Sequence, residues 1–312
     1  MRLSKLLLSC LLLQACSSLP QHQLPNNIAA QSQLDVPFIA QQQYYCGPAA
    51  LAEVAHFYGI DADQQSLAKQ LFIPDKEGSL AIEMQASTRR LGMLPYPLDK
   101  KLSALVTELD AGHPVLVFQN LTFSWLPQWH YALAVGYDMS TKELILHSGS
   151  HAYYRMPFRT FLKTWARTNY WALVMSEPEN IPATAEPTKY IRAAYAFEQT
   201  GQPELAAEFY AVAAQRWPDS LVVLSAQANL ALAVDDVPQA LVKFERVLQL
   251  DPENPALWNN YAYALLAASC SDAAQQAIAK AITLAPDDKQ YRDSEVEISS
   301  TQAPSVDACP RL

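Results

Sequence analysis

Two side chains in this sequence could together perform nucleophilic catalysis, namely Cys46 and His130. Cys46 is followed by Gly47, Pro48 and an apolar run with the spacing of a helix. A thiol at the start of a helix lies beside unpaired backbone N–H groups, whose partial positive charge favours the thiolate. His130 opens a strand-like run, and its imidazole could take the thiol proton and later return it. The pair predicts acyl-transfer or hydrolytic chemistry.

The elements that must position this pair are helices first and strands afterwards. Helical periodicity predicts helices over residues 48–58, 63–71, 79–91 and 101–111. Strand-like runs follow over residues 114–118, 130–137, 143–146 and 171–175. Helices followed by an antiparallel sheet define the α+β class, so we expect one such domain over residues 34–176.

This domain resembles the C39-type peptidases, which are papain-like cysteine peptidases. The resemblance rests on Val-Pro-Phe-Ile-Ala-Gln…Cys-Gly-Pro-Ala over residues 36–49, on Gly-His-Pro-Val-Leu-Val over 112–117, and on the strand of 130–138. It implies a papain-like fold of the α+β class. It also implies that Cys46 is the nucleophile, that His130 is the general base and acid, and that no cofactor takes part.

The resemblance further implies an oxyanion glutamine a few residues before the nucleophile. Such a side chain donates an N–H group to the tetrahedral intermediate. Gln41, Gln42 and Gln43 all fall in this region. Gln41 directly follows the Val-Pro-Phe-Ile-Ala segment and is therefore preferred over Gln42.

The third catalytic position departs from the family pattern. An Asp or Asn is expected on the strand after His130, where it would hold the orientation and tautomer of the imidazole. Ser148 occupies that position, and Asp138 is interpreted as a turn residue. Two alternatives stay open: a Cys-His pair whose ring is oriented by Ser148 or a backbone carbonyl, and a degenerate domain that only binds peptides.

The N-terminus has the features of an export signal. Arg2 and Lys5 precede the apolar run 6–13, which is too short to span a bilayer, and Leu-Gln-Ala-Cys ends at Cys16. This arrangement resembles a bacterial lipobox, which implies removal of residues 1–15, lipidation of Cys16 and a membrane anchor made of acyl chains. No Asp follows Cys16, so we expect an outer-membrane lipoprotein that faces the periplasm and carries a polar tether over 16–33.

Charge and cysteine usage limit the function classes. The chain of 312 residues has a net charge of −9, which disfavours binding to nucleic acid. In an oxidising compartment Cys270 and Cys309 could form a disulfide, although they could also be two unrelated thiols. No spacing of His and Cys resembles a metal site, so we expect none.

A period of 34 residues follows a proline-rich linker at 177–189. Four positions recur in register: a helix-ending proline, a small alanine, a bulky residue four positions after it, and one further apolar residue (Pro218, Pro252, Pro286; Ala206, Ala240, Ala274; Tyr210, Phe244, Ile278; Tyr190, Leu224, Trp258). This pattern resembles tetratricopeptide repeats (TPRs) and predicts an all-α domain of three repeats over 190–290, followed by a polar tail over 291–312.

The two halves together suggest one leading function and one alternative. The leading hypothesis is a membrane-anchored cysteine peptidase of the bacterial envelope, whose peptide or protein substrate, or a protein partner, is recruited by the groove of the TPR array. The alternative is a catalytically degenerate peptidase-like module that acts as a periplasmic scaffold lipoprotein.

Overall fold

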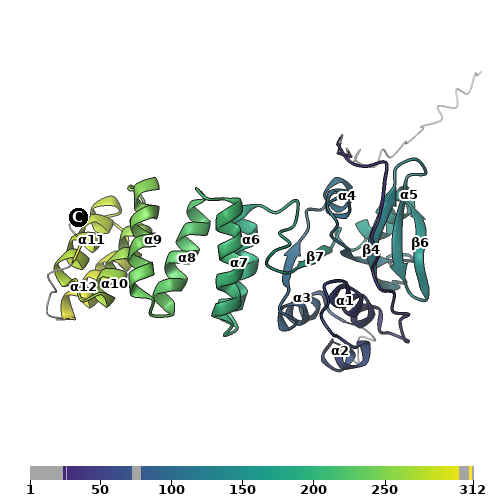
Figure 1. Cartoon of the computed structure of the whole chain (residues 1–312), viewed down its shortest axis with the longest axis horizontal. Coiled ribbons are helices and arrows are strands. Elements are labelled where there is room, and N and C mark those ends of the chain that lie inside the picture. Colours follow the sequence, from purple (N-terminus) through teal and green to yellow (C-terminus); the bar gives the residue numbers. More distant parts are fainter. Residues whose placement is uncertain (1–23, 26, 72–78, 302–308, 311–312) are drawn as a thin grey trace, which may run out of the picture.

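The computed structural model describes residues 24–25, 27–71, 79–301 and 309–310. The expected signal segment 1–15, the expected lipidation site Cys16 and most of the expected tether lie outside these residues. A mixed α and β domain is followed by an array of helices that extends to one side of it (Figure 1). The order confirms the predicted fold class, an α+β domain followed by an all-α domain.

The sheet of the first domain has seven antiparallel strands in the described residues. They are β1 (Gln31–Gln33), β2 (Leu94–Pro97), β3 (Val115–Asn120), β4 (Trp129–Asp138), β5 (Glu143–Ser148), β6 (His151–Pro157) and β7 (Ala172–Ser176). Their order across the sheet is β2-β7-β3-β4-β5-β6, and β1 pairs with the far end of β4. The first half of β4 pairs with β3 and its second half pairs with β5, so β4 lies in the middle of the sheet.

Helices cover both faces of this sheet (Figure 1). On one face lie α1 (Cys46–Phe57), α2 (Gln64–Leu71) and α3 (Ala81–Arg90), and on the other lie α4 (Leu102–Asp110) and α5 (Phe158–Ala166). Successive strand residues point to opposite faces. In β4, Tyr131 and Leu133 enter the core beneath α1, whereas Ala132 and Ala134 enter the core beneath α4 and α5.

Gly136 permits the close approach of β1 to β4. A Cβ atom at this position would lie 2.3 Å from the carbonyl oxygen of Ser32. The pairing of β4 with β5 also shifts register between Ala134 and Gly136. Glycine is therefore required where the end of the expected tether joins the sheet.

The second half consists of paired helices. They are α6 (Pro187–Gln199), α7 (Pro203–Arg216), α8 (Leu221–Ala233), α9 (Val237–Leu250), α10 (Pro255–Ala267), α11 (Ser271–Leu284) and α12 (Lys289–Ser300). The three repeated alanines are fully buried, and the three repeated prolines each follow the end of a helix by two residues. The residues after the first helix of each pair, Gly201, Asp235 and Ser269, all have a positive φ. A left-handed turn thus ends each first helix, as the repeat pattern requires.

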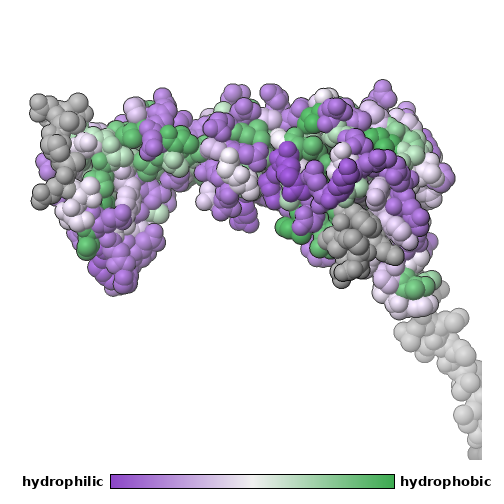
Figure 2. All heavy atoms as spheres, turned by 90° about the horizontal axis from the view of Figure 1, so that it is seen from below, coloured by the Kyte–Doolittle hydropathy of each residue, from purple (hydrophilic) through white to green (hydrophobic). Residues whose placement is uncertain are grey.

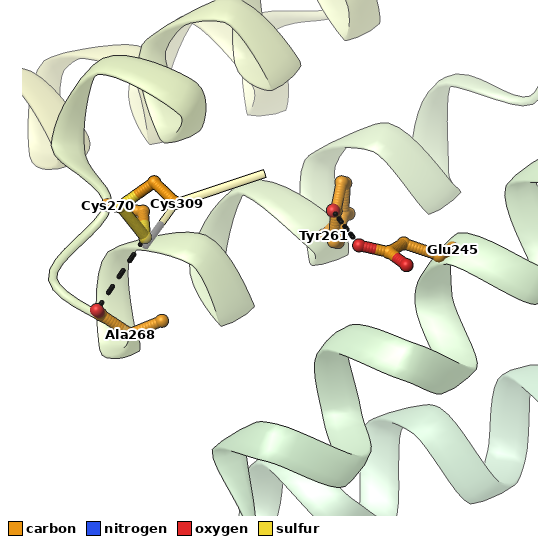
Figure 3. The surroundings of a disulfide bond; sticks show 5 residues. All are labelled: Glu245, Tyr261, Ala268, Cys270 and Cys309. Carbon is orange, nitrogen blue, oxygen red and sulfur yellow. Dashed lines mark hydrogen bonds between the residues drawn. A yellow bond between two sulfur atoms is a disulfide. The ribbon is translucent and has the colours of Figure 1, made fainter. Parts of the chain in front are cut away.

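The polar tail begins as the helix α12. Tyr291 and Ile298, seven residues apart, are buried on one face of it against the preceding repeat. Cys270 and Cys309 form a disulfide with their Cα atoms 5.5 Å apart (Figure 3). The disulfide joins the end of the chain to the turn before α11.

The linker lies against the first domain. The buried carboxylate of Glu108 in α4 accepts hydrogen bonds from the backbone N–H groups of Ala183 and Thr184, at 2.9 and 2.7 Å. The hydroxyl of Tyr96 in β2 donates to the carbonyl of Thr184, at 3.3 Å. The core beneath α4 continues into α6 and α7, so the two halves share one apolar cluster.

On the face viewed in Figure 2, hydrophobic residues gather along the helical array between hydrophilic ones. None of the helices in the described part of the chain is long and apolar enough to cross a membrane.

Candidate active site

The candidate nucleophile Cys46 is the first residue of α1, as the sequence predicts. Gly47, which follows it, lies so close to Met84 that an added Cβ would be 3.0 Å from the sulfur atom. Burial raises the pKa of the Cys46 thiol, and the backbone N–H groups of Tyr131 and Gly47 oppose this shift without cancelling it. The helix start alone would lower the pKa of this thiol. The pKa is raised instead, because the thiol is also enclosed by the sheet.

The glutamine segment before Cys46 is held by two connections. The backbone N–H of Gln41 donates to the carbonyl of Gly149, at 3.1 Å, and the N–H of Gln42 donates to the side chain of Gln64, at 3.0 Å. Gln41 lines a small pocket together with Cys46 and Ser148, whereas Gln42 does not. The structure thus brings three of the four predicted catalytic residues to one pocket.

The remaining predicted residue, His130, contacts Ser148, which occupies the third catalytic position. Its Nε2 atom lies 2.9 Å from the hydroxyl oxygen of Ser148. Burial lowers the pKa of His130 to about 4, so the ring is neutral at pH 7. Within the described residues no hydrogen bond joins His130 to Cys46, and His130 shares the strand parity of Ala132, whose side chain points away from α1.

A second imidazole lies on the α1 side of the sheet. His147 in β5 is 3% exposed, and its Nδ1 atom lies 3.3 Å from a carboxylate oxygen of Glu53 in α1. The other oxygen of Glu53 accepts the backbone N–H of Ile39, at 2.9 Å. Both side chains line the same pocket as Cys46. This pair was not predicted from the sequence, although an acidic residue within the apolar run of α1 is a signal for it.

Asp138 is the last residue of β4, and its side chain holds the turn that follows the strand. One of its oxygens accepts hydrogen bonds from the backbone N–H and the hydroxyl of Ser140, at 3.0 and 2.6 Å. The other oxygen pairs with Arg155 at 3.1 Å. Hydrogen bonds from Ser140 and then Arg155 hold the pKa of this carboxyl well below its usual range. Asp138 therefore stabilises the turn after β4.

Exposed aromatic residues lie beside the start of β4. In the segment that joins β3 to β4, Phe123 and Trp125 stack with their ring centroids 5.8 Å apart. Trp129, the residue before His130, stacks on Phe118, and its exposed fraction is 53%. Apolar surface is thus available next to the site. No cluster of metal-binding side chains occurs in the residues that the structure describes.

Known protein families match a segment in each half of the chain. Residues 33–173 match the family described as Peptidase_C39 like family, and residues 231–294 match the tetratricopeptide repeat. The chain therefore contains a C39-like peptidase domain followed by TPRs. This confirms the resemblance seen in the sequence and defines a peptidase-like protein with a protein-interaction module.

Solved structures resemble each half separately. A Bacillus anthracis protein described as a C39-like peptidase is 17% identical, and the match covers 48% of this chain and 98% of that chain with a TM-score of 0.40. The second TPR domain of human RPAP3, in complex with an HSP70 peptide, is 17% identical over 37% of this chain and 100% of that chain, with a TM-score of 0.34. An Arabidopsis OM64 TPR domain is 16% identical over 37% of this chain and 96% of that chain, also with a TM-score of 0.34. A comparison with curated proteins returned no match.

Proposed function

We propose that this protein is a cysteine peptidase of the bacterial envelope in which Cys46 is the nucleophile. The observation that carries the proposal is the shared pocket of Gln41, Cys46 and Ser148, at the point where α1 meets β5. Acyl transfer needs a nucleophile, an oxyanion donor and an imidazole with its orienting group on one carbonyl. The pocket holds the nucleophile and the donor, and Ser148 in its lining contacts the imidazole of His130.

Each residue has a defined task in this reaction. The Cys46 sulfur attacks a peptide carbonyl, and the oxyanion is held by the Gln41 side chain and the Cys46 backbone N–H. An imidazole protonates the leaving amine and then activates water to release the acyl group. The resemblance assigns this imidazole to His130, with Ser148 as its partner. One oxyanion donor of this kind contributes about 3 to 4 kcal/mol.

The TPR array supplies the contact with a protein substrate or partner. A cavity of about 230 Å³ lies between α7, α8 and α9, and its lining includes Tyr210, Leu230, Val234 and Lys243. A stacked array with a largely apolar cavity, whose lining also carries Lys243 and Asp236, suits an extended peptide. Since the linker is bonded to the peptidase domain through Glu108, a bound partner would be held at a fixed position relative to Cys46.

The envelope location rests on the lipobox-like segment that ends at Cys16. Lipidation of this residue would anchor the protein to the outer membrane, facing the periplasm. The disulfide between Cys270 and Cys309 supports an oxidising compartment, since such bonds rarely persist in the cytosol.

The test is cleavage of a defined peptide mixture, analysed by mass spectrometry. The full-length protein in detergent should cleave peptides, the Cys46→Ala variant should not, and the Asp138→Asn variant should remain active. The reading as a peptidase would be wrong if the wild-type protein left all peptides intact and its Cys46 failed to react with a peptidyl electrophile that labels papain-like enzymes.

A second candidate function is peptide binding without catalysis. It is favoured by the raised pKa of Cys46 and the lowered pKa of His130, which leave both groups neutral in the resting protein. In that case Cys46→Ala would retain both peptide binding and the cellular phenotype of the wild-type gene. Loss of the phenotype in this variant would exclude a scaffold role.

A further inference from the structure

We propose that α5 and the loop between β3 and β4 form a surface that lies against an anionic phospholipid bilayer. The loop covers residues 121–128 and, with Trp129, supplies the apolar part of this surface. Arg159, Lys163 and Arg167 supply its positive charge. The inference uses the envelope location proposed above and goes beyond it, because it concerns which side of the peptidase domain faces the membrane.

Positive charge is concentrated on this side of an acidic protein. The chain has 31 acidic and 22 basic residues, yet residues 144–176 contain four basic residues and no acidic one. Three of the four follow each other at intervals of four residues along α5 and its C-cap, so they share one face of the helix. All three are exposed, and no ion pair among the described residues involves them. An anionic surface is therefore attracted to α5 although the protein as a whole is negative.

The loop is a closed hairpin that presents apolar side chains to solvent. The N–H of Leu121 donates to the carbonyl of Gln128 at 2.9 Å, and Phe123 and Leu126 form a β-bridge. The exposed fractions of Phe123, Trp125 and Leu126 are 61%, 78% and 60%. Neighbouring exposed apolar groups mark an interaction surface, and tryptophan is enriched where proteins meet the membrane interface. A projecting hairpin suits insertion into lipid, whereas a peptide is bound in a concave site.

The cations and the apolar loop lie side by side. Lys163 and Arg167 line one cavity of about 400 Å³ together with Leu121 and Phe123. The guanidinium of Arg167 also donates to the carbonyl of Asn120 at 3.0 Å, which holds it at the base of the loop. Apolar side chains of such a surface enter the boundary of the acyl chains, while the cationic groups stay among the phosphates. The surface has both parts in the order that a bilayer requires.

An acyl anchor at Cys16 makes this contact a matter of orientation. The description of the chain begins at Leu24, and eight residues span at most about 28 Å, so an anchored domain would stay close to the bilayer. One flexible attachment does not determine which side of the domain faces the lipid. Helices α5 and α1 cover opposite faces of the sheet (Figure 1). Contact through α5 would therefore turn the α1 side away from the membrane.

The test is quenching of Trp125 fluorescence by phospholipids that carry bromine in their acyl chains. The full-length protein is reconstituted from detergent into vesicles of phosphatidylglycerol or of phosphatidylcholine, each containing brominated lipid. The part of the quenching that disappears in Trp125→Ser belongs to Trp125. It should be strong in phosphatidylglycerol, and it should be several-fold weaker in phosphatidylcholine or when the salt concentration is raised to about 1 M.

A charge reversal on α5 provides the specific variant. Each basic residue at an anionic surface contributes about fivefold to binding. Lys163→Glu should therefore lower the ratio of quenched to unquenched Trp125 in phosphatidylglycerol vesicles by about fivefold or more. Lys69→Glu is the matched control, because it makes the same charge change at an exposed position of α2, on the other face of the sheet. This control should be quenched as the wild-type protein is.

The outcomes separate the inference from the envelope location on which it rests. Absence of Trp125 quenching in phosphatidylglycerol vesicles would overturn the inference, as would equal quenching in Lys163→Glu and Lys69→Glu. Salt-sensitive binding of an acidic peptide without quenching by the brominated lipid would assign the cations to a peptide and would also overturn it. Mass spectrometry of Cys16 tests the anchor separately. If Cys16 carries no acyl chains, the same quenching measured with vesicles added to the full-length chain still decides the inference.

Discussion

A buried carboxylate, that of Glu108, supplies several of the hydrogen bonds between the two halves, and replacing Glu108 with alanine should weaken their connection. Glu108 accepts the N–H groups of Ala183 and Thr184 and the hydroxyl of Thr184, and it lies 2.7 Å from Nδ1 of His113. Its side chain is fully buried. Removing it would leave several enclosed donors without an acceptor.

The expected magnitude follows from these partners. Each buried donor left unpaired costs about 1 to 3 kcal/mol, and breaking a buried charged network typically costs about 3 to 5 kcal/mol in total. For a domain of this size each kcal/mol lowers Tm by about 2 to 4 °C, so Glu108→Ala should lower Tm by roughly 6 to 20 °C. Glu108→Gln, which keeps the shape but loses the charge, should cost about 1 to 3 kcal/mol.

Calorimetry and limited proteolysis together would measure this effect. The variant should melt earlier and should be cut faster within residues 177–186 than the wild-type protein. Glu204→Ala, at an exposed position of α7, is the control and should change stability by less than about 0.5 kcal/mol. A Tm within 1 °C of wild type and an unchanged cutting rate in Glu108→Ala would refute the reasoning.

The same carboxylate makes the junction sensitive to acid. Desolvation tends to raise the pKa of Glu108, but hydrogen bonds from His113 and Thr184 outweigh it, and the pKa lies below its ordinary value of 4.5. A depressed pKa in the folded state means that the stabilisation is complete above about pH 4.5 and is lost as the pH falls below that value. Proteolysis of the linker by an acid-active protease should therefore accelerate in this range.

Four further outcomes are expected. Gln41→Ala should lower kcat by about 10² to 10³ in peptide cleavage assays, because one oxyanion donor is lost. Reducing the Cys270–Cys309 disulfide, which closes a loop of 39 residues, should destabilise the helical array by about 4 kcal/mol in denaturant titrations. Because the pKa of His130 falls from 6.5 to about 4 on folding, roughly 3 kcal/mol of stability should be lost as the pH falls from 6.5 to 4, and His130→Gln should remove this dependence. Asp138→Asn should leave the labelling rate of Cys46 unchanged, which separates a turn residue from a catalytic one.

The repeated half could be predicted from the sequence because each repeat contacts mainly its neighbours. A buried alanine such as Ala240 and a helix-ending proline such as Pro252 have the same structural role in every repeat. The second half of α12, beyond Ser294, was not predicted because the buried residues of this helix, Tyr291 and Ile298, are few and are surrounded by charged residues. Its stability comes from packing on the array, which no local pattern shows.

The peptidase half was predicted less completely. The start of α1 at Cys46 follows from the Gly-Pro pair, but the strand β6 was missed because most of its side chains are exposed and it lies at the edge of the sheet. The contact of Glu53 with His147 joins residues 94 positions apart. Only the pairing of β4 with β5 and the packing of α1 bring them together, so sequence spacing could not reveal it.

The serine at the third catalytic position does not by itself decide whether this domain is an enzyme, because its hydroxyl still contacts Nε2 of His130. In this protein α1 carries both Cys46 and Glu53, and the contact of Glu53 with His147 in β5 joins the helix to the sheet. The position of Cys46 consequently depends on the seating of α1 on the sheet. A substitution that shifts α1, such as Gly47→Ala beside Met84, should then slow labelling of Cys46 although it removes no catalytic group. Wild-type labelling in this variant would show that the position of the helix is not what sets the reactivity of the thiol.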